Sequence, residues 1–244
     1  MHNGPLLELK PMQLFQLPKS ATTEVGLLID RRIKQRSARY PIGGVPKRLL
    51  DILVSSSALL AFAPLFLLVA LLLKVTDRGA ILYRQPRVGF RSSSFGCLKF
   101  RTMVMDGDAV LARYLRDNPE AAREWAETRK LKRDPRVTAV GQVLRQTSLD
   151  ELPQLWNILR GDMSIVGPRP VVAEEITMYG PSAGHYLLTR PGLTGAWQVS
   201  GRNDVSYERR VSLDRDYVEN WSFWNDIKII AKTVPVLITA KGTY

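Results

Sequence analysis

The chain is poor in the residues that build metal clusters and covalent crosslinks. It has one cysteine, Cys97, and two histidines, His2 and His185. A lone cysteine excludes an intramolecular disulfide, and so few sulfur and imidazole ligands exclude a Cys/His zinc cluster. The chemistry of this protein must therefore rest on carboxylates, lysines, arginines and hydroxyl groups.

Two common phosphate-binding patterns are also missing. The sequence contains neither G-x-G-x-x-G nor the P-loop pattern, so neither a dinucleotide-binding fold nor a nucleotide triphosphatase is indicated. Residues 1–30 lack the basic-then-apolar order of a secretory signal. We therefore expect the chain to stay on the cytoplasmic side of the membrane.

Positive charge, in contrast, is abundant. The net charge is +12 at pH 7 and the isoelectric point is near 10.0. Such a chain favours an anionic partner, and nucleic acid, anionic lipid and phosphorylated substrates all fit. The 244 residues suffice for one domain with its own core and a small added element.

Residues 1–46 have the composition of an N-terminal extension. The segment is mixed in polarity and ends in a basic run at Arg31, Arg32, Lys34, Arg36 and Arg39. Anionic headgroups would hold such a run beside a membrane segment. A solvated flexible tail fits the same composition, and both interpretations stay open.

An uncharged apolar run follows from Ile52 to Leu73. Its length of roughly 22 residues would let a helix cross a bilayer core of about 30 Å, and a spanning helix is the default interpretation. Pro64 near its midpoint predicts a kink instead, with two arms of about 11 residues that each reach only one leaflet. Basic residues flank both ends of the run, where a simple span should show a bias to one side.

A helix that enters, bends at Pro64 and leaves on the same face would satisfy both observations. The backbone carbonyl that the proline leaves free could be met by Ser55, Ser56 or Ser57, or by local distortion of the helix. A spanning helix, a re-entrant hairpin and, more remotely, a buried core helix are the three alternatives.

Two strand-like runs follow, at 80–85 and 95–101, and predict a β-hairpin with a longer loop. Lys99 and Arg101 would project from one face of the second strand. Asp106-Gly107-Asp108 comes next and invites comparison with a metal-binding D-x-D motif. Because it immediately precedes a helical run at 110–130, we favour helix capping over metal binding.

The most informative stretch surrounds an adjacent acid pair, Asp150 and Glu151. Ser148 and Glu151 match a capping box, so that the acids could simply cap a helix. Pro153, which is comfortable only in a first turn, moves the expected helix start toward Asp150. In either case the helix dipole favours ionised carboxylates, which is the form that attacks phosphorus.

Downstream segments complete the pattern. Residues 136–160 have the character of helical pieces, with an apolar stripe predicted to be core at Leu152, Leu155, Trp156 and Leu159. The turns at 168–170, 190–195 and 200–203 each carry an arginine that could meet phosphates or a nucleoside. The aromatic and lysine-rich segment after 220 fits an interfacial helix or a helix packed on the core.

Taken together, these residues resemble the bacterial sugar transferase family, the monotopic phosphoglycosyl transferases. The resemblance covers 46–244 and lies in the kinked apolar run, Lys99-Phe100-Arg101-Thr102-Met103, 145–153, 161–170, 190–195 and Gly201-Arg202-Asn203. The larger members carry an N-terminal bundle of membrane helices. This chain resembles the compact form, closest to the enzymes that initiate exopolysaccharide synthesis.

The resemblance implies roles for individual residues. Asp150 matches the nucleophile, and Glu151 matches the carboxylate that holds magnesium. Basic and loop residues match positions near the nucleotide sugar, and Asp214 matches a recurrent acid. The implied substrate-binding set is Lys99, Arg101, Arg145, Pro168, Arg169, Pro170, Arg190, Gly192, Thr194, Arg202 and Asp214. One departure is that Ala63-Pro64 stands where the family commonly has Ser-Pro at the kink.

We therefore predict a mainly helical α+β fold: a basic extension (1–46), a re-entrant membrane helix (47–78) and a cytoplasmic catalytic domain (79–244) with a β-hairpin and interfacial helices. The implied activity is transfer of a hexose 1-phosphate from a UDP-hexose to undecaprenyl phosphate with Mg²⁺, releasing UMP, at the cytoplasmic face of a bacterial inner membrane. Anionic lipids are expected partners and nucleic acid is not, and a homo-oligomer is allowed. The alternatives are a glycosyl transferase that releases UDP and a non-catalytic basic protein that docks on membrane or nucleic acid.

Overall fold

The computed structural model describes residues 39–201 and 205–238. Helices predominate in these segments, and the described strands form two separate two-stranded sheets. The predicted class, a mainly helical α+β fold, is confirmed at this level. Most of the extension 1–46 and Arg202 lie outside the described residues, so the predictions made for them stay predictions.

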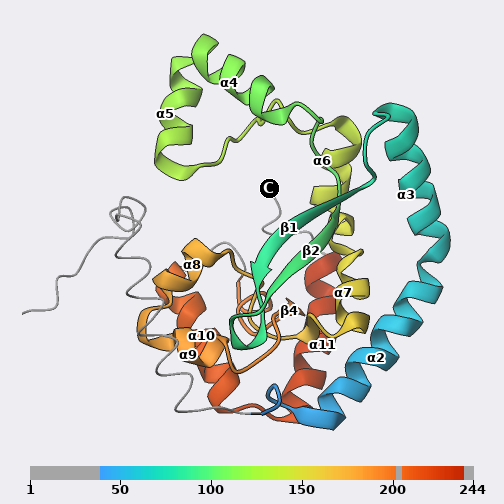
Figure 1. Cartoon of the computed structure of the whole chain (residues 1–244), viewed down its shortest axis with the longest axis vertical. Helices are drawn as coiled ribbons and strands as arrows, with labels where there is room; N and C mark the ends of the chain where they lie inside the picture. The colour runs from blue at the N-terminus through green and yellow to red at the C-terminus, as the bar shows by residue number, and fades with distance from the viewer. Residues whose placement is uncertain (1–38, 202–204, 239–244) are drawn as a thin grey trace, which may run out of the picture.

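Helices α2 (Gly44–Ala61) and α3 (Ala63–Thr76) form one bent element along a side of the molecule (Figure 1). Their axes differ by 60° at the break between them. Pro64 lies in the first turn of α3, where its missing N–H is not needed. Among the described residues no single helix is long and apolar enough to cross a bilayer, whereas this bent pair passes by length and composition.

The two sides of α2 differ in polarity. Apolar side chains such as Leu49, Leu53 and Leu60 are exposed, whereas Lys47, Asp51 and Ser55 are buried. The Ser55 hydroxyl donates to the carbonyl oxygens of Asp51 and Ile52, one turn back in the same helix. Ser55 therefore does not donate to a free carbonyl at the kink, so this expectation was wrong for Ser55.

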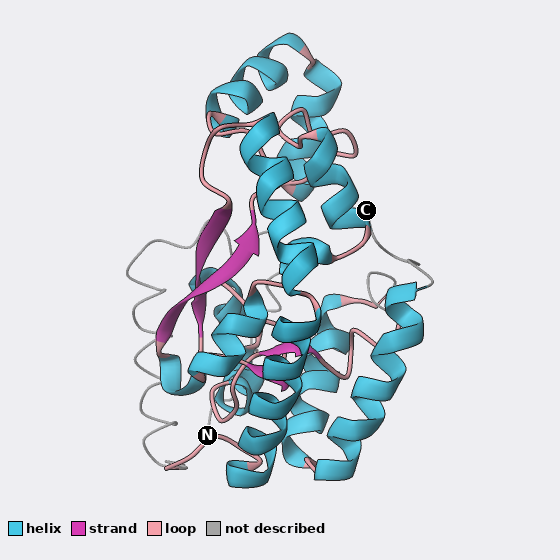
Figure 2. Cartoon of the chain, turned by 90° about the vertical axis from the view of Figure 1, so that its right-hand side faces the viewer, coloured by secondary structure: helices cyan, strands magenta, loops and turns pink. Residues whose placement is uncertain are grey.

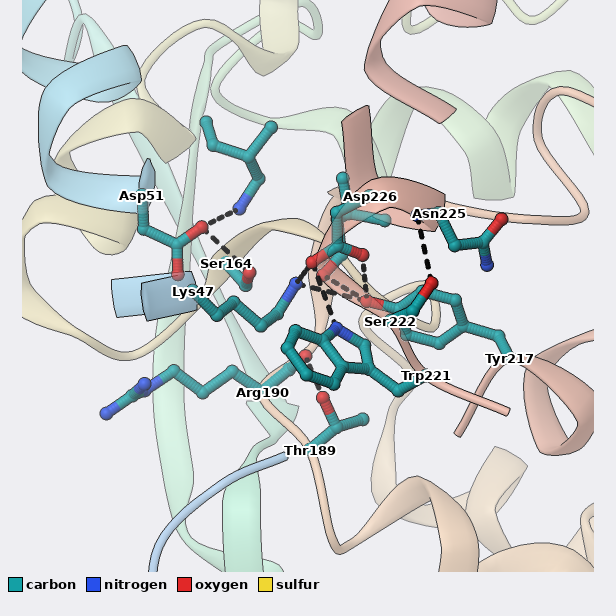
Figure 3. A network of polar contacts seen from close by, with 12 residues as sticks. Lys47, Asp51, Ser164, Thr189, Arg190, Tyr217, Trp221, Ser222, Asn225 and Asp226 are labelled. Carbon is teal, nitrogen blue, oxygen red and sulfur yellow. Dashed lines mark hydrogen bonds and ion pairs between the residues drawn. The ribbon is translucent and has the colours of Figure 1, made fainter. Parts of the chain in front are cut away.

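The buried polar side of α2 is bonded to the rest of the protein (Figure 3). Lys47 Nζ lies 2.6 Å from Asp226 Oδ2 and 3.0 Å from the Tyr217 hydroxyl. That hydroxyl donates to Asp226 Oδ1 at 2.7 Å, and Trp221 Nε1 donates to Asp226 Oδ2 at 3.0 Å. We call Lys47, Tyr217, Trp221 and Asp226 the anchor network, because it fixes the start of α2 to the C-terminal helices.

The predicted hairpin is present. Strands β1 (Leu82–Val88) and β2 (Ser94–Phe100) pair antiparallel, with Lys99 opposite Tyr83. A 3₁₀ turn, η2 (Phe90–Ser92), lies in the loop between them. β1 tolerates Pro86 because it is an edge strand, where a missing N–H costs little.

The helical run expected at 110–130 is two helices, α4 (Gly107–Asp117) and α5 (Pro119–Thr128), which project from one end of the molecule (Figure 1). Pro119 explains the break, since a proline begins a helix more readily than it continues one. Asp106 holds the N-cap position without a side-chain hydrogen bond, so capping by Asp106 was wrong. The metal alternative gains no support, because no cluster of three or more His, Cys, Asp or Glu occurs in the part of the chain that the structure describes.

Beyond the β-hairpin, the fold is centred on a short parallel strand pair enclosed by helices (Figure 2). Strand β3 (Ser164–Val166) pairs with β4 (Gly192–Thr194). A Cβ at Gly192 would collide with the backbone nitrogen of Gly167, so the two backbones meet closely. The enclosing elements are α6 (Ala139–Gln146), η3 (Leu149–Glu151), α7 (Gln154–Arg160), α8 (Ala173–Met178), η4 (Gly180–Ser182), α9 (Ala183–Tyr186), α10 (Tyr207–Glu219) and α11 (Phe223–Ile238).

The apolar stripe predicted on α7 is partly wrong. Leu155 is buried and packs with Ile158, but the Trp156 side chain is 54% exposed. Asn157 lies in the core instead, with none of its surface exposed. Because the helix turns 100° per residue, a shift of the buried face by one residue moves Trp156 outward and Asn157 inward.

Candidate active site

The acid pair lies on a tight turn between two helices. Helix α6 ends at Gln146, and Ser148 then adopts a left-handed conformation with φ 57°. Asp150 and Glu151 follow in the 3₁₀ turn η3, and α7 begins only at Gln154. Ser148 makes no side-chain capping bond, so the capping-box interpretation was wrong. We call residues 148–151 the acid turn; its unusual backbone presents two carboxylates ahead of α7.

Lys99 on β2 contacts both acids. Its ammonium nitrogen lies 2.7 Å from Glu151 Oε1 and 3.3 Å from Asp150 Oδ2. The side chains are partly open to solvent, at 25% for Lys99, 11% for Asp150 and 33% for Glu151. The acid pair and Lys99 therefore lie at the edge of the core and are not sealed within it.

Burial and the neighbouring charges together set the pKa values of Asp150 and Lys99. Burial raises the pKa of Asp150 above its usual value, and the Glu151 charge adds to this while Lys99 opposes it. Burial alone would lower the pKa of Lys99, but Glu151 and Asp150 outweigh it and the net shift is upward. Lys99 is thus held as an ammonium ion, and Asp150 is a carboxylate that burial makes more basic.

Arg145 adds positive charge on the other side of the acid turn. It lies in the last turn of α6, and its Nε donates to the Thr102 hydroxyl at 2.9 Å. Its charge acts to lower the pKa of Asp150. Gly141 lets α6 approach this region, because a Cβ there would collide with the Thr102 carbonyl oxygen.

Arg169 lies in a loop whose two flanking prolines are buried. Pro168 and Pro170 are buried while Arg169 between them is exposed, and its charge opposes protonation of Lys99. Arg87 on β1 donates to the Pro170 carbonyl at 3.2 Å. The loop is therefore tied to the hairpin that carries Lys99.

The buried Tyr186 side chain connects strand β1 to the same loop. The Val88 N–H donates to the Val171 carbonyl at 2.9 Å. The Tyr186 hydroxyl accepts from the Val171 N–H at 3.2 Å and donates to the Val88 carbonyl at 2.9 Å. Tyr186 thus completes the second half of a backbone pairing between β1 and the loop.

Other predicted site residues make their contacts elsewhere. Arg101 pairs with Asp77 at the end of α3, through Nη2 at 3.2 Å from Oδ2. Arg190 donates from Nε to the Gly161 carbonyl at 2.7 Å, at the opposite end of α7 from the acid turn. These two arginines support the frame in the structure, and their contact with substrate stays a prediction.

Gly192, Thr194 and Asp214 are also buried parts of the frame. Gly192 and Thr194 lie in β4, and the Thr194 hydroxyl is 2.8 Å from that of Thr233 on α11. Asp214 on α10 accepts from the Tyr179 hydroxyl at 2.9 Å, and burial raises its pKa to about 7. The structure places none of these side chains in contact with the acid turn.

The sequence assigned no role to Thr102, Tyr186 or Asn157, although Thr102 lies in the 99–103 motif. The roles of Thr102 and Tyr186 follow only from long-range contacts in the structure. Asn157 left a usable signal, since an amide among apolar residues at helical spacing must find buried partners.

The arrangement suits chemistry at phosphate. Two ionisable carboxylates, an ammonium and two guanidinium groups converge from β2, η3, α6 and the 168–170 loop, a set that can bind phosphate oxygens and offer a nucleophile. Burial raises the pKa of the Cys97 thiol to about 11, so the cysteine is not a competing nucleophile at neutral pH.

Comparison with known proteins agrees with this class of site. The family model for bacterial sugar transferases matches residues 42–240. The chain is 55% identical over 211 residues to the exopolysaccharide production protein ExoY of Rhizobium meliloti (strain 1021), covering 86% of this chain and 93% of that protein. This chain therefore belongs to the bacterial sugar transferase family.

Two further relatives carry names that state a reaction. An undecaprenyl-phosphate galactose phosphotransferase of Salmonella typhimurium is 48% identical over 223 residues, covering 91% of this chain and 45% of that protein. A UDP-glucose:undecaprenyl-phosphate glucose-1-phosphate transferase of Caulobacter vibrioides is 40% identical over 206 residues, covering 81% and 72%.

Proposed function

We propose that this protein transfers a hexose 1-phosphate from a UDP-hexose to undecaprenyl phosphate, as the first membrane step of exopolysaccharide or related glycan synthesis. The observation that carries the proposal is the contact of Lys99 with both Asp150 and Glu151 at an accessible turn. The reactions named for two relatives support the same class of transfer.

The reaction proceeds in two displacements at one phosphorus. A carboxylate oxygen of Asp150 attacks the sugar-bearing phosphorus, the bond to the bridging oxygen breaks, and UMP leaves with that oxygen. A phosphate oxygen of the polyprenyl acceptor then attacks the same phosphorus and releases Asp150 as a carboxylate. A covalent intermediate lets two bulky substrates react in turn at one site.

The basic residues around the acid turn neutralise the transferring group. Lys99 and Arg145 flank Asp150, and Arg169 is exposed on the adjoining loop. Guanidinium and ammonium groups stabilise charge on phosphoryl oxygens in the transition state. Because the Lys99 charge also opposes protonation of Asp150, it keeps more of the nucleophile ionised at a given pH.

The acid pair fits magnesium shared with the donor. Magnesium prefers one or two carboxylates plus substrate phosphates and waters to a cage made only of protein. Glu151 is the more exposed of the two acids, and it would hold the ion while Asp150 attacks. The ion would supply charge neutralisation at the diphosphate oxygens.

The bent helix suits a lipid acceptor. We propose that residues 47–78 lie in one leaflet, with the exposed apolar side of α2 and α3 toward lipid and the polar side of α2 on the catalytic domain (79–244). Both ends of the bend would then face the cytoplasm at the inner membrane. Anionic headgroups would contact the basic residues that flank the bent helix pair α2–α3.

Nucleotide analysis tests the proposal. The full chain in lipid nanodiscs is incubated with UDP-galactose or UDP-glucose, Mg²⁺ and undecaprenyl phosphate. We expect UMP and a lipid-linked hexose diphosphate, and the donor with the higher kcat/KM identifies the sugar. Release of UDP with a lipid-linked hexose monophosphate would establish plain glycosyl transfer instead, and absence of turnover with either donor would contradict the proposal.

A further inference from the structure

The Asn157 side chain forms two hydrogen bonds with β2, the strand that carries Lys99. Its side-chain oxygen accepts from the Leu98 N–H at 2.9 Å, and its side-chain nitrogen donates to the Gly96 carbonyl at 2.9 Å. Gly96 and Leu98 are two residues apart, so their backbone groups point to the same edge of β2. Pro86 stands opposite Gly96 and has no N–H, consistent with an edge of β2 that faces away from β1.

The amide therefore behaves as a short extra strand. It supplies one acceptor and one donor at the spacing that a neighbouring strand would use. An apolar residue in its place would leave the Leu98 N–H and the Gly96 carbonyl without these partners, and unmatched buried backbone groups are costly.

Asn157 is itself held firmly. It is fully buried, and its side-chain nitrogen also lies 3.2 Å from Asp162 Oδ2. Its backbone carbonyl accepts from the N–H groups of Gly161, Asp162 and Met163 at the end of α7. The Asn157 amide is thus held in place at the C-terminal end of α7 and does not move freely with β2.

The two hydrogen bonds of the Asn157 side chain lie between elements that carry residues of the candidate active site. Leu98 is the neighbour of Lys99, and α7 is the helix that continues from the acid turn. Asn157 consequently joins the element that carries Lys99 to the element that carries Asp150 and Glu151. The Lys99 ammonium can lie 2.7 Å from Glu151 and 3.3 Å from Asp150 only if β2 and α7 keep this alignment.

We propose that Asn157 is a positioning residue for the transfer reaction: its amide holds β2 against α7 so that the Lys99 ammonium stands between Asp150 and Glu151. This inference rests on the proposed function, because it assigns a role within the same site. It adds a residue that touches neither substrate nor reacting atoms.

A double-variant cycle tests the inference. Asn157→Leu should lower kcat/KM by up to about 10²-fold, as a displaced catalytic group does. It should also move the acidic limb of the pH–rate profile upward, in the direction that Lys99→Met moves it. In the double variant, Asn157→Leu should add little to either effect, because the ammonium that it positions is already absent.

Ile158→Ala is the matched control. Ile158 is adjacent on α7 and equally buried, but its side chain makes no polar contact with β2. We expect it to lower the melting temperature and to leave the acidic limb in place. If Asn157→Leu does not fold, Asn157→Gln keeps a neutral amide but lengthens the side chain, and the same upward move is expected.

A readout that needs no turnover separates this inference from the proposed function. The full chain is labelled with ¹³C at the lysine Cε, and the Lys99 signal is assigned by its loss in Lys99→Met. Asn157→Leu should shift that signal, while Ile158→Ala should leave it in place. An unchanged Lys99 signal and acidic limb in Asn157→Leu, or effects that multiply in the double variant, would overturn the positioning role whether or not wild-type protein turns over.

Discussion

Two lysines of this protein pair with aspartates, in opposite settings. Lys47 and Asp226 are 5% and 0% exposed, and Tyr217 and Trp221 supply further hydrogen bonds to the aspartate. Lys99 and Asp150 are 25% and 11% exposed, and Glu151 competes for the same ammonium. The first pair is closed and fully hydrogen-bonded, and in the second, more open pair a second acid shares the same ammonium.

The difference separates anchoring from chemistry. A buried pair with all its partners in place is costly to break, because either partner alone would be a desolvated charge. At the acid turn the Lys99 ammonium is shared by two partly exposed acids, so its contacts can be exchanged when phosphate or a metal ion arrives. The same residue types therefore fix the bent helix pair α2–α3 to the rest of the protein and, at the acid turn, are arranged for chemistry at phosphate.

The largest expected effect is at the open pair. Asp150→Asn removes the nucleophile and should lower UMP release by at least about 10⁴-fold, as loss of a covalent catalyst does. The melting temperature should change little, because Asp150 is not part of the anchor network. Rate and melting temperature are measured on the same preparation, and near-normal turnover would refute the role of Asp150.

Breaking the closed pair should act on stability. Lys47→Met leaves Asp226 buried without its cation and should cost about 3–5 kcal/mol. Thermal unfolding in nanodiscs measures the loss. Lys47→Met combined with Asp226→Leu removes both charges and should recover part of it, whereas equal or greater loss in the double variant would show that the ion pair is not the source.

Removing the cation of the open pair should change the pH dependence. Lys99→Met should lower kcat/KM by about 10²–10³-fold, the range for loss of one group that stabilises transition-state charge. Because the Lys99 charge lowers the pKa of Asp150, its loss should move the acidic limb of activity to higher pH. An acidic limb at an unchanged pH would show that Asp150 ionisation does not limit the rate.

Asp214 extends the comparison, because this buried carboxylate has no ion pair among the described residues. Its pKa is about 7 in the folded protein, above the usual value of 3.8, so the folded state binds the proton more tightly than the unfolded state. Its contribution to stability is full below about pH 4 and is lost as pH rises toward 7, with a slope of up to about 1.4 kcal/mol per pH unit. Asp214→Asn should flatten the fall in melting temperature between pH 4 and 8, whereas Asp216→Asn on the exposed side of α10 should not.

The sequence predicted local features well. The bend next to Pro64, the β-hairpin and the helical pieces around the acid pair all follow from residues close in the chain. The family resemblance of the 145–170 segment was confirmed by the family match over residues 42–240. Local rules failed at Ser148, which takes the N-cap position of η3 without a side-chain capping bond, and at Trp156, which faces outward.

Long-range contacts could not be predicted in the same way. Lys47 and Asp226 lie 179 positions apart, and no period or motif links them. The parallel β3–β4 pair consists of three-residue strands that are too short to show a pattern. Arg101 and Arg190 were assigned to substrate by resemblance, while their contacts in the structure are with Asp77 and with the end of α7.

The central claim is that Asp150 forms a covalent bond to the phosphorus of the donor. The most direct test is intact-mass spectrometry of protein that is treated with UDP-hexose, without acceptor, and quenched in acid. We predict a hexose phosphate adduct that maps to the peptide with Asp150, disappears on addition of undecaprenyl phosphate and is absent from Asp150→Asn. Wild-type protein that turns over normally but shows no adduct under these conditions would contradict the claim.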